Sequence, residues 1–466
     1  MKQYDVIVIG SGGGSKITTP ASKLGLKVAV IEKDRLGGTC LNRGCIPSKM
    51  LIHPADVAQE IRDAARFDIH NNPNFTVDFN KLVTRISNTV DADSYGISAG
   101  YGKNPNIDFY HGTARFTADK IIAVNGEELT ADKIFVAVGS RPGIPDIQGI
   151  TETPYWTSTE ALRNTALPRK MTIIGASYIA VELGHAYGAL GTEVHFLVRS
   201  RFLRQEDQET AAEFSRVFAQ RYDCHFGAVP ERVEHRNGRF RVAYQQDGDS
   251  KTMMSDALLI ATGVVPNTDT LDLHNTSMEL TDEGYIRVDD YLCTSIPGVY
   301  AMGDCIGRHF FRHTVNFEGE YLFRSVFKES DPKPLRYRPV PHAIFSNPQV
   351  AGVGKTEEEL KAEGVEYVAA VNPYKKSAMG MALLSDHGFC KLLLCARTRK
   401  ILGAHIVGPE ASNMLHMIIA FMNKDGTLDD LLNMIYIHPA LPEIVRNTAR
   451  NAQAEFDKRV AQTVSG

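Results

Sequence analysis

A strand, a glycine-rich turn, a helix and a second strand follow one another twice in this sequence, and this repeated unit constrains the fold most strongly. The first copy runs from the apolar stretch Tyr4–Gly10 to Val28–Glu32. The second copy runs from Met171–Ile174 through Gly175 to Val194–Val198. The strands are continuously apolar, which is typical of parallel strands covered by helices on both faces. The sequence therefore predicts an α/β chain with two Rossmann-like dinucleotide-binding units.

The segments between and after these units predict the domain organisation. Lys133–Pro142 and Leu258–Asn267 are apolar stretches of similar pattern that close the first and second unit, with glycines at Gly139 and Gly263. The chain then returns to the first domain, and its last third lacks a glycine-rich turn, which indicates a C-terminal α+β domain. The expected domains are residues 1–150 with 270–339, residues 151–269, and residues 340–466.

Charge and cysteine content exclude several classes of protein. The 466 residues carry 51 Lys and Arg against 55 Asp and Glu, without a block of like charge, so neither nucleic acid nor a membrane surface is an expected partner. The apolar run Val6–Ile9 is too short for a signal segment or a membrane span, which predicts a cytoplasmic protein. Seven cysteines argue against a secreted disulfide framework, and Cys224, Cys293 and Cys305 lack partners at metal-ligand spacing, so no metal site is expected.

The first turn has the composition of a pyrophosphate site. A helix N-terminus presents unpaired N–H groups, and glycine allows the ligand to approach them. Gly10, Gly12 and Gly13 occupy this place, and Glu32 ends the second strand where a ribose hydroxyl would lie. Ser15 stands at the third glycine position of the motif, which predicts looser packing between helix and sheet.

The second unit ends differently. Val198 occupies the strand end where the first unit has its acid, and Arg199, Arg201 and Arg204 follow it. An acid there would repel a 2′-phosphate, whereas arginines bind a phosphate through charge-assisted hydrogen bonds. The sequence predicts NADPH rather than NADH at this site, and the alternative is a solvated basic loop.

Cys40 and Cys45, directly after the first unit, form the most specific motif of the chain. A disulfide beside a flavin can accept electrons and pass them to a substrate disulfide by thiolate exchange. The alternative of two inert buried cysteines is disfavoured by the surrounding glycines and the adjacent nucleotide site. Cys390 and Cys395 have the same spacing but lie in an apolar strand, where residues five apart point to opposite faces, so that pair is not expected to close.

Along essentially its whole length the chain resembles the pyridine nucleotide-disulfide oxidoreductases. The resemblance implies that Cys40 exchanges with substrate, that Cys45 contacts FAD, and that Lys49 lies beside the flavin and pairs with Glu182. It implies FAD binding by Gly10, Gly12, Gly13, Glu32, Gly38, Thr39, Lys49, Gly139, Gly303 and Asp304. It implies NAD(P) binding by Gly175, Tyr178, Ile179, Arg199, Arg201, Arg204 and Gly263, with Tyr178 as the aromatic that covers the flavin.

The segment Ile437–Glu443 resembles the C-terminal motif of the same family. The resemblance implies that His438 exchanges protons with the thiols and that Glu443 fixes the tautomer of the imidazole. In the family this histidine reaches the active site of the partner subunit. A homodimer with shared active sites is therefore implied.

The substrate remains open between two readings. The basic strand end, Ser15 and the C-terminal motif favour reduction of a small disulfide, as in the members that reduce mycothione. The core motif and His313 with Glu318 also fit a dihydrolipoamide dehydrogenase that oxidises protein-bound dihydrolipoamide. A non-enzymatic flavoprotein component of a multienzyme complex is a remote alternative, disfavoured by the complete catalytic set and the absence of a carrier domain.

Overall fold

The first sheet is built on the first predicted unit. In the computed structural model, which describes residues 1–70 and 75–465, seven strands form this sheet in the order β3-β2-β1-β6-β5-β4, with β16 paired to β6. The strands are β1 (Lys2–Ile9), β2 (Val28–Glu32), β3 (Ile107–His111), β4 (Arg115–Ala118), β5 (Ile121–Val124), β6 (Glu127–Val136) and β16 (Val299–Ala301). Strand β1 pairs in parallel with both β2 and β6. Because β16 comes from late in the sequence, the chain returns to this sheet after building the second unit.

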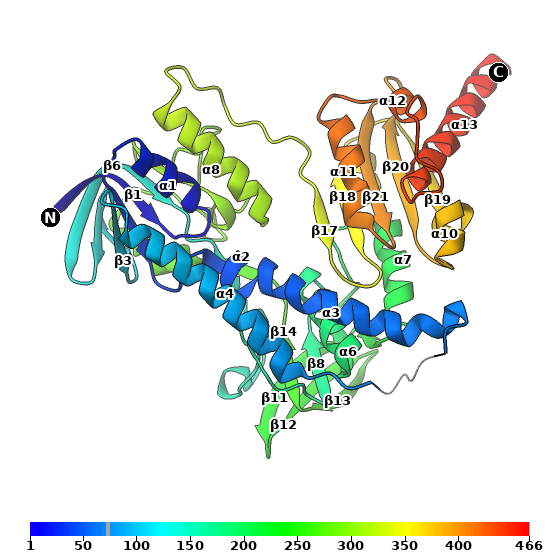
Figure 1. Ribbon diagram of the computed structural model, residues 1–466, viewed down its shortest axis with the longest axis horizontal. Coiled ribbons are helices and arrows are strands. Elements are labelled where there is room, and N and C mark those ends of the chain that lie inside the picture. The colour runs from blue at the N-terminus through cyan, green and yellow to red at the C-terminus, as the bar shows by residue number, and fades with distance from the viewer. Residues whose placement is uncertain (71–74, 466) are drawn as a thin grey trace.

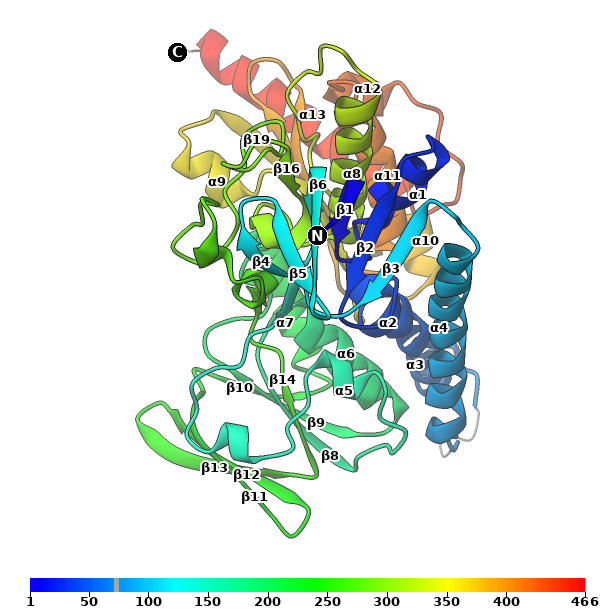
Figure 2. The same cartoon turned by 90° about the vertical axis from the view of Figure 1, so that its left-hand side faces the viewer.

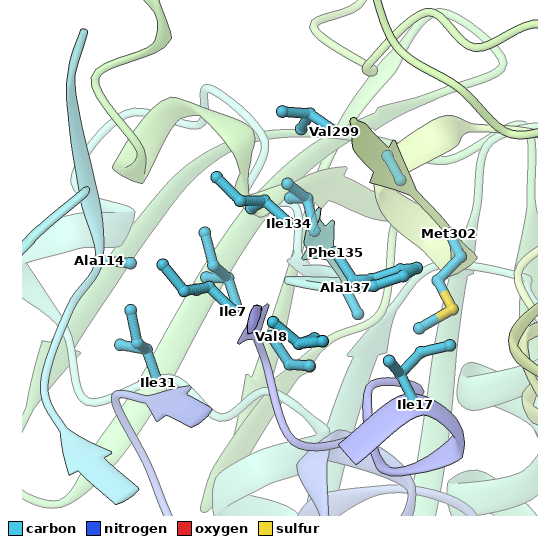
Figure 3. Packing of buried hydrophobic residues seen from close by; sticks show 14 of the residues in the cluster. Ile7, Val8, Ile17, Ile31, Ala114, Ile134, Phe135, Ala137, Val299 and Met302 are labelled. Atoms are coloured by element: carbon cyan, nitrogen blue, oxygen red, sulfur yellow. The ribbon is translucent and has the colours of Figure 1, made fainter. Parts of the chain in front are cut away.

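Apolar side chains fill both faces of the first sheet. Ile7, Ile31, Ile134 and Phe135 are almost completely buried, and Figure 3 shows them packed together with Val299. The helices beside this sheet and at its carboxyl edge are α1 (Ser15–Lys23), α2 (Gly38–Arg43), α3 (Cys45–Asp63), α4 (Phe79–Gly102) and α8 (Arg312–Phe327). Continuous burial on both faces explains the absence of alternation in the strand sequences.

The second sheet repeats the parallel core of the first. Its order is β10-β9-β8-β14, and all its strand pairs are parallel. The elements of this region are α5 (Ser158–Ala161), β8 (Lys170–Ile174), α6 (Tyr178–Leu190), β9 (Glu193–Val198), α7 (Gln208–Phe218), β10 (Asp223–Phe226) and β14 (Ala257–Ile260). On one face Phe196 packs with the residues of α6, and on the other face Leu197 packs with a separate cluster.

That other face is covered by an antiparallel sheet that the sequence analysis did not predict. It consists of β11 (Val229–Arg236), β12 (Arg239–Gln246) and β13 (Asp249–Ser255). Its inward residues Val233, Phe240 and Val242 pack against Leu197. Figure 2 shows this sheet at the outer end of the second unit.

The two chain segments that connect the nucleotide units pair with each other. Strands β7 (Ser140–Pro142) and β15 (Val264–Pro266) form an antiparallel ladder. Arg141 reinforces this crossing, because its guanidinium donates to the Pro266 carbonyl at 3.0 Å and pairs with Asp269 at 2.6 Å. The connection between the units is therefore double-stranded.

The C-terminal region has a five-stranded antiparallel sheet in the order β17-β18-β21-β20-β19. Its elements are β17 (His342–Ile344), β18 (Val350–Gly354), α9 (Glu357–Ala362), β19 (Tyr367–Pro373), α10 (Ala378–Ala382), β20 (Phe389–Cys395), β21 (Ile401–Val407), α11 (Ala411–Met422), α12 (Leu428–Leu432) and α13 (Glu443–Ser465). The short 3₁₀ helices of the chain are η1 (Ala64–Phe67), η2 (Ile150–Glu152), η3 (Asn267–Thr270), η4 (Leu273–Asn275), η5 (Gly303–Ile306) and η6 (Tyr374–Lys376).

The predicted fold class is confirmed: two Rossmann-like units precede an α+β region. Within the described ranges, no helix combines the length and the apolar character that crossing a membrane requires.

Candidate active site

The first glycine turn is shaped by two positions that exclude a side chain. Gly10 ends β1 with φ of +97°, and a Cβ atom there would lie 2.3 Å from the Ala137 carbonyl oxygen. Gly38, with φ of +67°, is so close to the turn that its Cβ would lie 2.6 Å from the Cα of Gly12. The turn and the start of α2 therefore meet backbone to backbone, with Thr39 following in the same turn of helix. This leaves main-chain groups, not side chains, to face a ligand.

Close packing of α1 on the sheet comes from Gly14, not from the third glycine position of the motif. A Cβ on Gly14 would lie 2.4 Å from Cγ1 of Val8, on β1, and 2.1 Å from the Gly10 carbonyl oxygen. The side chain of Ser15 instead donates to the Gly12 carbonyl oxygen at 2.8 Å. The looser packing expected from Ser15 is thus absent, because the preceding residue takes over the contact.

Glu32 is held at the carboxyl end of β2, above the glycine turn. Its Oε2 accepts hydrogen bonds from the Ser11 amide at 2.9 Å and from the Ser11 hydroxyl at 2.8 Å, and its Oε1 accepts from the Asp34 amide at 3.0 Å. The Gly37 amide donates to the same Ser11 hydroxyl at 3.0 Å. The acid and the turn therefore form one hydrogen-bonded unit.

Helix η5 brings Gly303 and Asp304, two of the predicted FAD-binding residues, to the same sheet edge. Ser140, next to Gly139, donates its hydroxyl to Asp304 at 2.6 Å, and burial raises the pKa of the Asp304 carboxyl. The Gly303 amide donates to Oε2 of Glu318 at 2.6 Å. Strand ends from early and late parts of the chain thus converge beside the glycine turn.

A cavity of about 580 Å³ joins the glycine turn to the first cysteine. Its lining includes Ser11, Gly12, Gly37, Cys40, Tyr101 and Arg312. A main-chain cradle, an acid at the strand end and an adjoining cavity fit an extended dinucleotide cofactor whose far end reaches the thiols.

The two cysteines of the motif lie at a helix junction. Cys40 belongs to α2, and Cys45 is the first residue of α3, so the intervening turn at Gly44 folds them back toward each other. Both are free thiols in this structure. A hydrogen bond with Cys45 lowers the pKa of Cys40 to about 7, with Arg312 contributing, and the same hydrogen bond raises the pKa of Cys45. The pair therefore supplies one thiolate near neutral pH.

Lys49 and Glu182 form the predicted ion pair across two helices. Nζ of Lys49, on α3, lies 2.7 Å from Oε2 of Glu182, on α6. The other carboxylate oxygen accepts from the Phe345 amide at 2.9 Å, and the Lys49 ammonium lies 4.6 Å from the centroid of the Phe345 ring. The pair thus connects the second unit and the C-terminal region one turn after Cys45.

Tyr178, the first residue of α6, is tied to a buried acid. Its hydroxyl donates to Oε1 of Glu206 at 3.0 Å, and Nε2 of His342 lies 2.7 Å from Oε2 of the same carboxylate. Its ring stacks with those of His342 and Phe311. Burial opposes the charge on Glu206, but the hydrogen bond with His342 outweighs it and lowers the pKa of the carboxyl.

The second glycine turn reproduces the backbone of the first. Gly175 ends β8 with φ of +135°, and a Cβ there would lie 2.2 Å from the Ala261 carbonyl oxygen. Ile179 is half-buried in the first turn of α6, and Gly263, directly before β15, has open space where a Cβ would lie. The strand-to-helix turn is therefore shaped in both units by the same contact with a neighbouring strand.

The end of β9 differs from that of β2 in its charge. Val198 is completely buried, and the chain reaches the surface directly after it. Arg199 and Arg204 are exposed, and Arg201 donates to the Arg204 carbonyl oxygen at 3.0 Å. In the part of the chain that the structure describes, none of these three arginines forms an ion pair.

His438 and Glu443 form the predicted dyad at the start of α13. Nδ1 of His438 lies 3.0 Å and 3.1 Å from the two carboxylate oxygens, and the Ala440 amide and the Arg446 guanidinium also contact Glu443. The hydrogen bond with His438 lowers the pKa of Glu443, whose side chain is 3% exposed, while that of His438 is 71% exposed. This leaves Nε2 of the imidazole as the atom for proton exchange.

A single chain does not bring this dyad to its own thiols. The loop between α12 and α13 and the helix α2 lie in separate parts of the molecule (Figure 1). The arrangement agrees with a site completed by a second chain.

Arg312, Glu206 and His342 were not among the predicted site residues. Each lies outside the motifs and reaches its partner through the fold, so no local spacing marks it.

Comparison with known proteins identifies the family. Residues 4–320 match the family described as pyridine nucleotide-disulphide oxidoreductase, and residues 340–449 match its dimerisation domain. Mycothione reductase of Mycobacterium tuberculosis is 34% identical over 96% of this chain and 99% of its own length. Dihydrolipoyl dehydrogenase of Bacillus subtilis is 33% identical over 97% of this chain and 96% of its own length.

A solved structure gives the same answer. The HOCl-induced flavoprotein disulfide reductase RclA from Escherichia coli has a TM-score of 0.85 at 26% identity, covering 96% of this chain and 99% of that one. The match to a dimerisation domain supports a homodimer. The chain therefore belongs to the pyridine nucleotide-disulphide oxidoreductase family and is a flavin-dependent disulfide oxidoreductase, an enzyme that acts on sulfur groups.

Proposed function

We propose that the chain reduces a small disulfide with electrons from NADPH, through FAD at the first glycine turn and the Cys40–Cys45 pair. The observation that carries this proposal is the cavity that contains both the glycine turn and Cys40. We assign FAD to residues 1–150 with 270–339, the nicotinamide nucleotide to 151–269, and dimerisation to 340–466. When bound, FAD would accept a hydride from NADPH and pass two electrons to the disulfide.

The thiols carry out the exchange in two steps. The Cys40 thiolate attacks one sulfur of the substrate disulfide, which forms a mixed disulfide and releases one substrate thiolate. Cys45 then attacks the sulfur of Cys40, closes the internal disulfide and releases the second thiol. The lowered pKa of Cys40, about 7, supports its role as the attacking thiolate.

His438 of the second chain would protonate the departing thiolate. Its exposed ring is oriented by Glu443, whose buried carboxylate stabilises the imidazolium and fixes the tautomer. The separation of the dyad from α2 within one chain supports this shared arrangement.

Two further pairs would serve hydride transfer. The Lys49–Glu182 ion pair lies one turn after Cys45, where its ammonium would adjoin the cofactor ring. Tyr178 starts the helix of the second glycine turn, and its ring would cover the cofactor until the nicotinamide takes its place. Gly175, Ile179 and Gly263 would contact that nucleotide.

NADPH is favoured over NADH by the charge at the end of β9. Among the residues that the structure describes, Arg199, Arg201 and Arg204 form no ion pair with a carboxylate, so they can pair with a 2′-phosphate. The buried Val198 offers no acceptor to a ribose hydroxyl.

The substrate favoured here is a mycothione-like disulfide. The alternative is dihydrolipoamide, supported by the near-equal identity to dihydrolipoyl dehydrogenase and by Glu318, which is completely buried against Gly303. The two readings differ in the direction of electron flow as well as in the substrate.

Purified holoenzyme should be assayed with NADPH and with NADH against mycothiol disulfide, glutathione disulfide and lipoamide, and in reverse with dihydrolipoamide and NAD(P)⁺. We expect turnover with NADPH and the small disulfide, and its loss in Cys45→Ser. Preferred oxidation of dihydrolipoamide with NAD⁺ would establish the alternative, and full activity of Cys45→Ser would refute both.

A further inference from the structure

A second cluster of coordinating side chains lies on the outer edge of the second unit. Nδ1 of His195, on β9, lies 2.5 Å from Oδ2 of Asp223, and Nε2 of His225, on β10, lies 3.0 Å from the same oxygen. One ligand atom from each of these three residues lies within 4.8 Å of the others. Two imidazoles and one carboxylate therefore converge on a single point.

The strand register produces this convergence. Asp223 pairs with His195 across the parallel ladder, and His225, two residues on, points to the same face as Asp223. Cys224, between them, points to the opposite face and packs with the α6 side of the sheet. Its thiol is therefore not part of the cluster.

The outer nitrogen of each imidazole is already fixed by another group. Nε2 of His195 lies 2.7 Å from Oε1 of Glu193, which also pairs with Lys170 at 3.2 Å. Nδ1 of His225 lies 3.3 Å from the hydroxyl of Tyr244, on the covering strand β12. Metal-binding histidines characteristically have their second nitrogen held in this way, which sets the tautomer and orients the ring.

The two imidazoles of the cluster are more buried than its carboxylate. The side chain of His195 is 8% exposed and that of His225 is 23% exposed, whereas that of Asp223 is 52% exposed and opens toward solvent. The carboxylate is thus reachable from solvent, while the two imidazoles are held at the partly buried edge of the sheet.

We propose that His195, Asp223 and His225 bind a divalent transition-metal ion, with Zn²⁺ as the preferred class, and that the ion ties β10 to β9 outside the redox centre. Imidazole with carboxylate suits Zn²⁺ better than the hard cations Mg²⁺ and Ca²⁺, which take oxygen ligands. Three protein ligands leave a fourth tetrahedral position for water. The sequence analysis expected no metal site, because the ligands come from two strands separated along the chain.

Zn²⁺ binding tests this proposal on tag-free holoenzyme that has been treated with a chelator. The enzyme is kept oxidised, so that Cys40 and Cys45 are closed and do not compete for the ion. Calorimetric titration with Zn²⁺ should show one site per chain in the wild type. We expect binding at least tenfold weaker in Asp223→Asn and in His225→Ala.

A matched control separates this site from adventitious imidazole binding. His274 is an exposed histidine of η4, and His274→Ala should bind Zn²⁺ as the wild type does. The isosteric Asp223→Asn keeps the test valid if His225→Ala fails to fold, and FAD absorbance reports folding independently. Absence of a site in the wild type, or unchanged binding in both ligand variants, would overturn the proposal.

Discussion

The two glycine-turn units share a backbone and differ in what surrounds it. In both, a strand ends in a glycine whose Cβ would collide with a carbonyl oxygen of the neighbouring strand, that of Ala137 in the first unit and that of Ala261 in the second. In the first, the next strand ends in Glu32, which is hydrogen-bonded to the turn. In the second, the next strand ends in a buried valine followed by arginines.

This difference indicates that the backbone geometry of the turn and the selectivity for a nucleotide depend on different residues. Main-chain contacts between strand and turn set where a pyrophosphate can lie, and they tolerate no side chain at Gly10 or Gly175. The exposed residues just beyond the strand end, such as Arg199 and Arg204, are free to vary, because they do not pack in the core. The reactive thiols of Cys40 and Cys45 likewise lie on α2 and α3, after the repeated unit and not within it.

The largest expected difference between the two units is in thiol reactivity. The pKa of Cys40, after the first unit, is lowered to about 7, whereas burial raises the pKa of Cys224, inside the second, to about 12. In the reduced enzyme at pH 7.5, iodoacetamide should modify Cys40 on the order of 10³-fold faster than Cys224. Mass spectrometry of timed samples measures both rates.

The pH dependence of this reaction tests the cause. The rate at Cys40 should rise as the pH increases through about 7, because the thiolate is the reactive form. Arg312→Ala should move the rise to higher pH, since the guanidinium favours the thiolate. Equal rates for the two cysteines would contradict the assigned electrostatics.

Substituting alanine for each turn glycine should affect one cofactor and not the other. In Gly10→Ala the new Cβ overlaps a carbonyl oxygen, so we expect the affinity for FAD to fall by about 100-fold or more, through strain and distortion of the turn. In Gly175→Ala FAD should be retained, while kcat/KM for NADPH falls by a similar factor. The visible absorbance of the flavin measures how much FAD each variant retains. Loss of FAD from Gly175→Ala would contradict the assignment of the two cofactors to different units.

The arginines at the end of β9 should affect only the nucleotide that carries a 2′-phosphate. Arg199→Ala and Arg204→Ala should each lower kcat/KM for NADPH by about tenfold to 100-fold, the equivalent of one charge-assisted hydrogen bond, and leave kcat/KM for NADH unchanged. Arg236→Ala, an exposed arginine of the same unit, serves as the control. An equal loss with NADH would show that the arginines do not read the phosphate.

The smallest effect is expected at the serines of the two turns. Ser11→Ala removes the hydroxyl that bridges Glu32 and the Gly37 amide, so the affinity for FAD should fall by about threefold to tenfold. In the second unit, Ser177 stands at the position of Gly12, and its hydroxyl donates to the Ala261 carbonyl oxygen at 3.1 Å. Ser177→Ala should leave FAD affinity unchanged in an equilibrium titration of the apoprotein.

The parts of the fold that could be predicted are those encoded locally. Apolar strands ending in Gly10 and Gly175 identify both units, and the spacing of Cys40 and Cys45 identifies the thiol pair. The His438–Glu443 contact is also local, since the partners are five positions apart where the chain enters α13.

The remainder depends on long-range packing. Strand β12 alternates apolar and polar residues, but β11 and β13 are mostly polar, so the role of the three strands as a cover becomes visible only with the sheet beneath them. Arg312 reaches Cys40 from the start of α8, and His342 reaches Glu206 from the C-terminal sheet. No spacing in the sequence indicates these contacts, because the partners are far apart along the chain and come together only in the folded structure.

The chain passes from the core to the surface between Val198 and Arg199, and this has a consequence for evolution. Exchanging exposed side chains just beyond a completely buried strand costs little stability, usually within about 0.5 kcal/mol. Under the proposed role of these arginines, a few surface mutations would change which nicotinamide nucleotide supplies the electrons, while the buried strand and the thiols stay as they are.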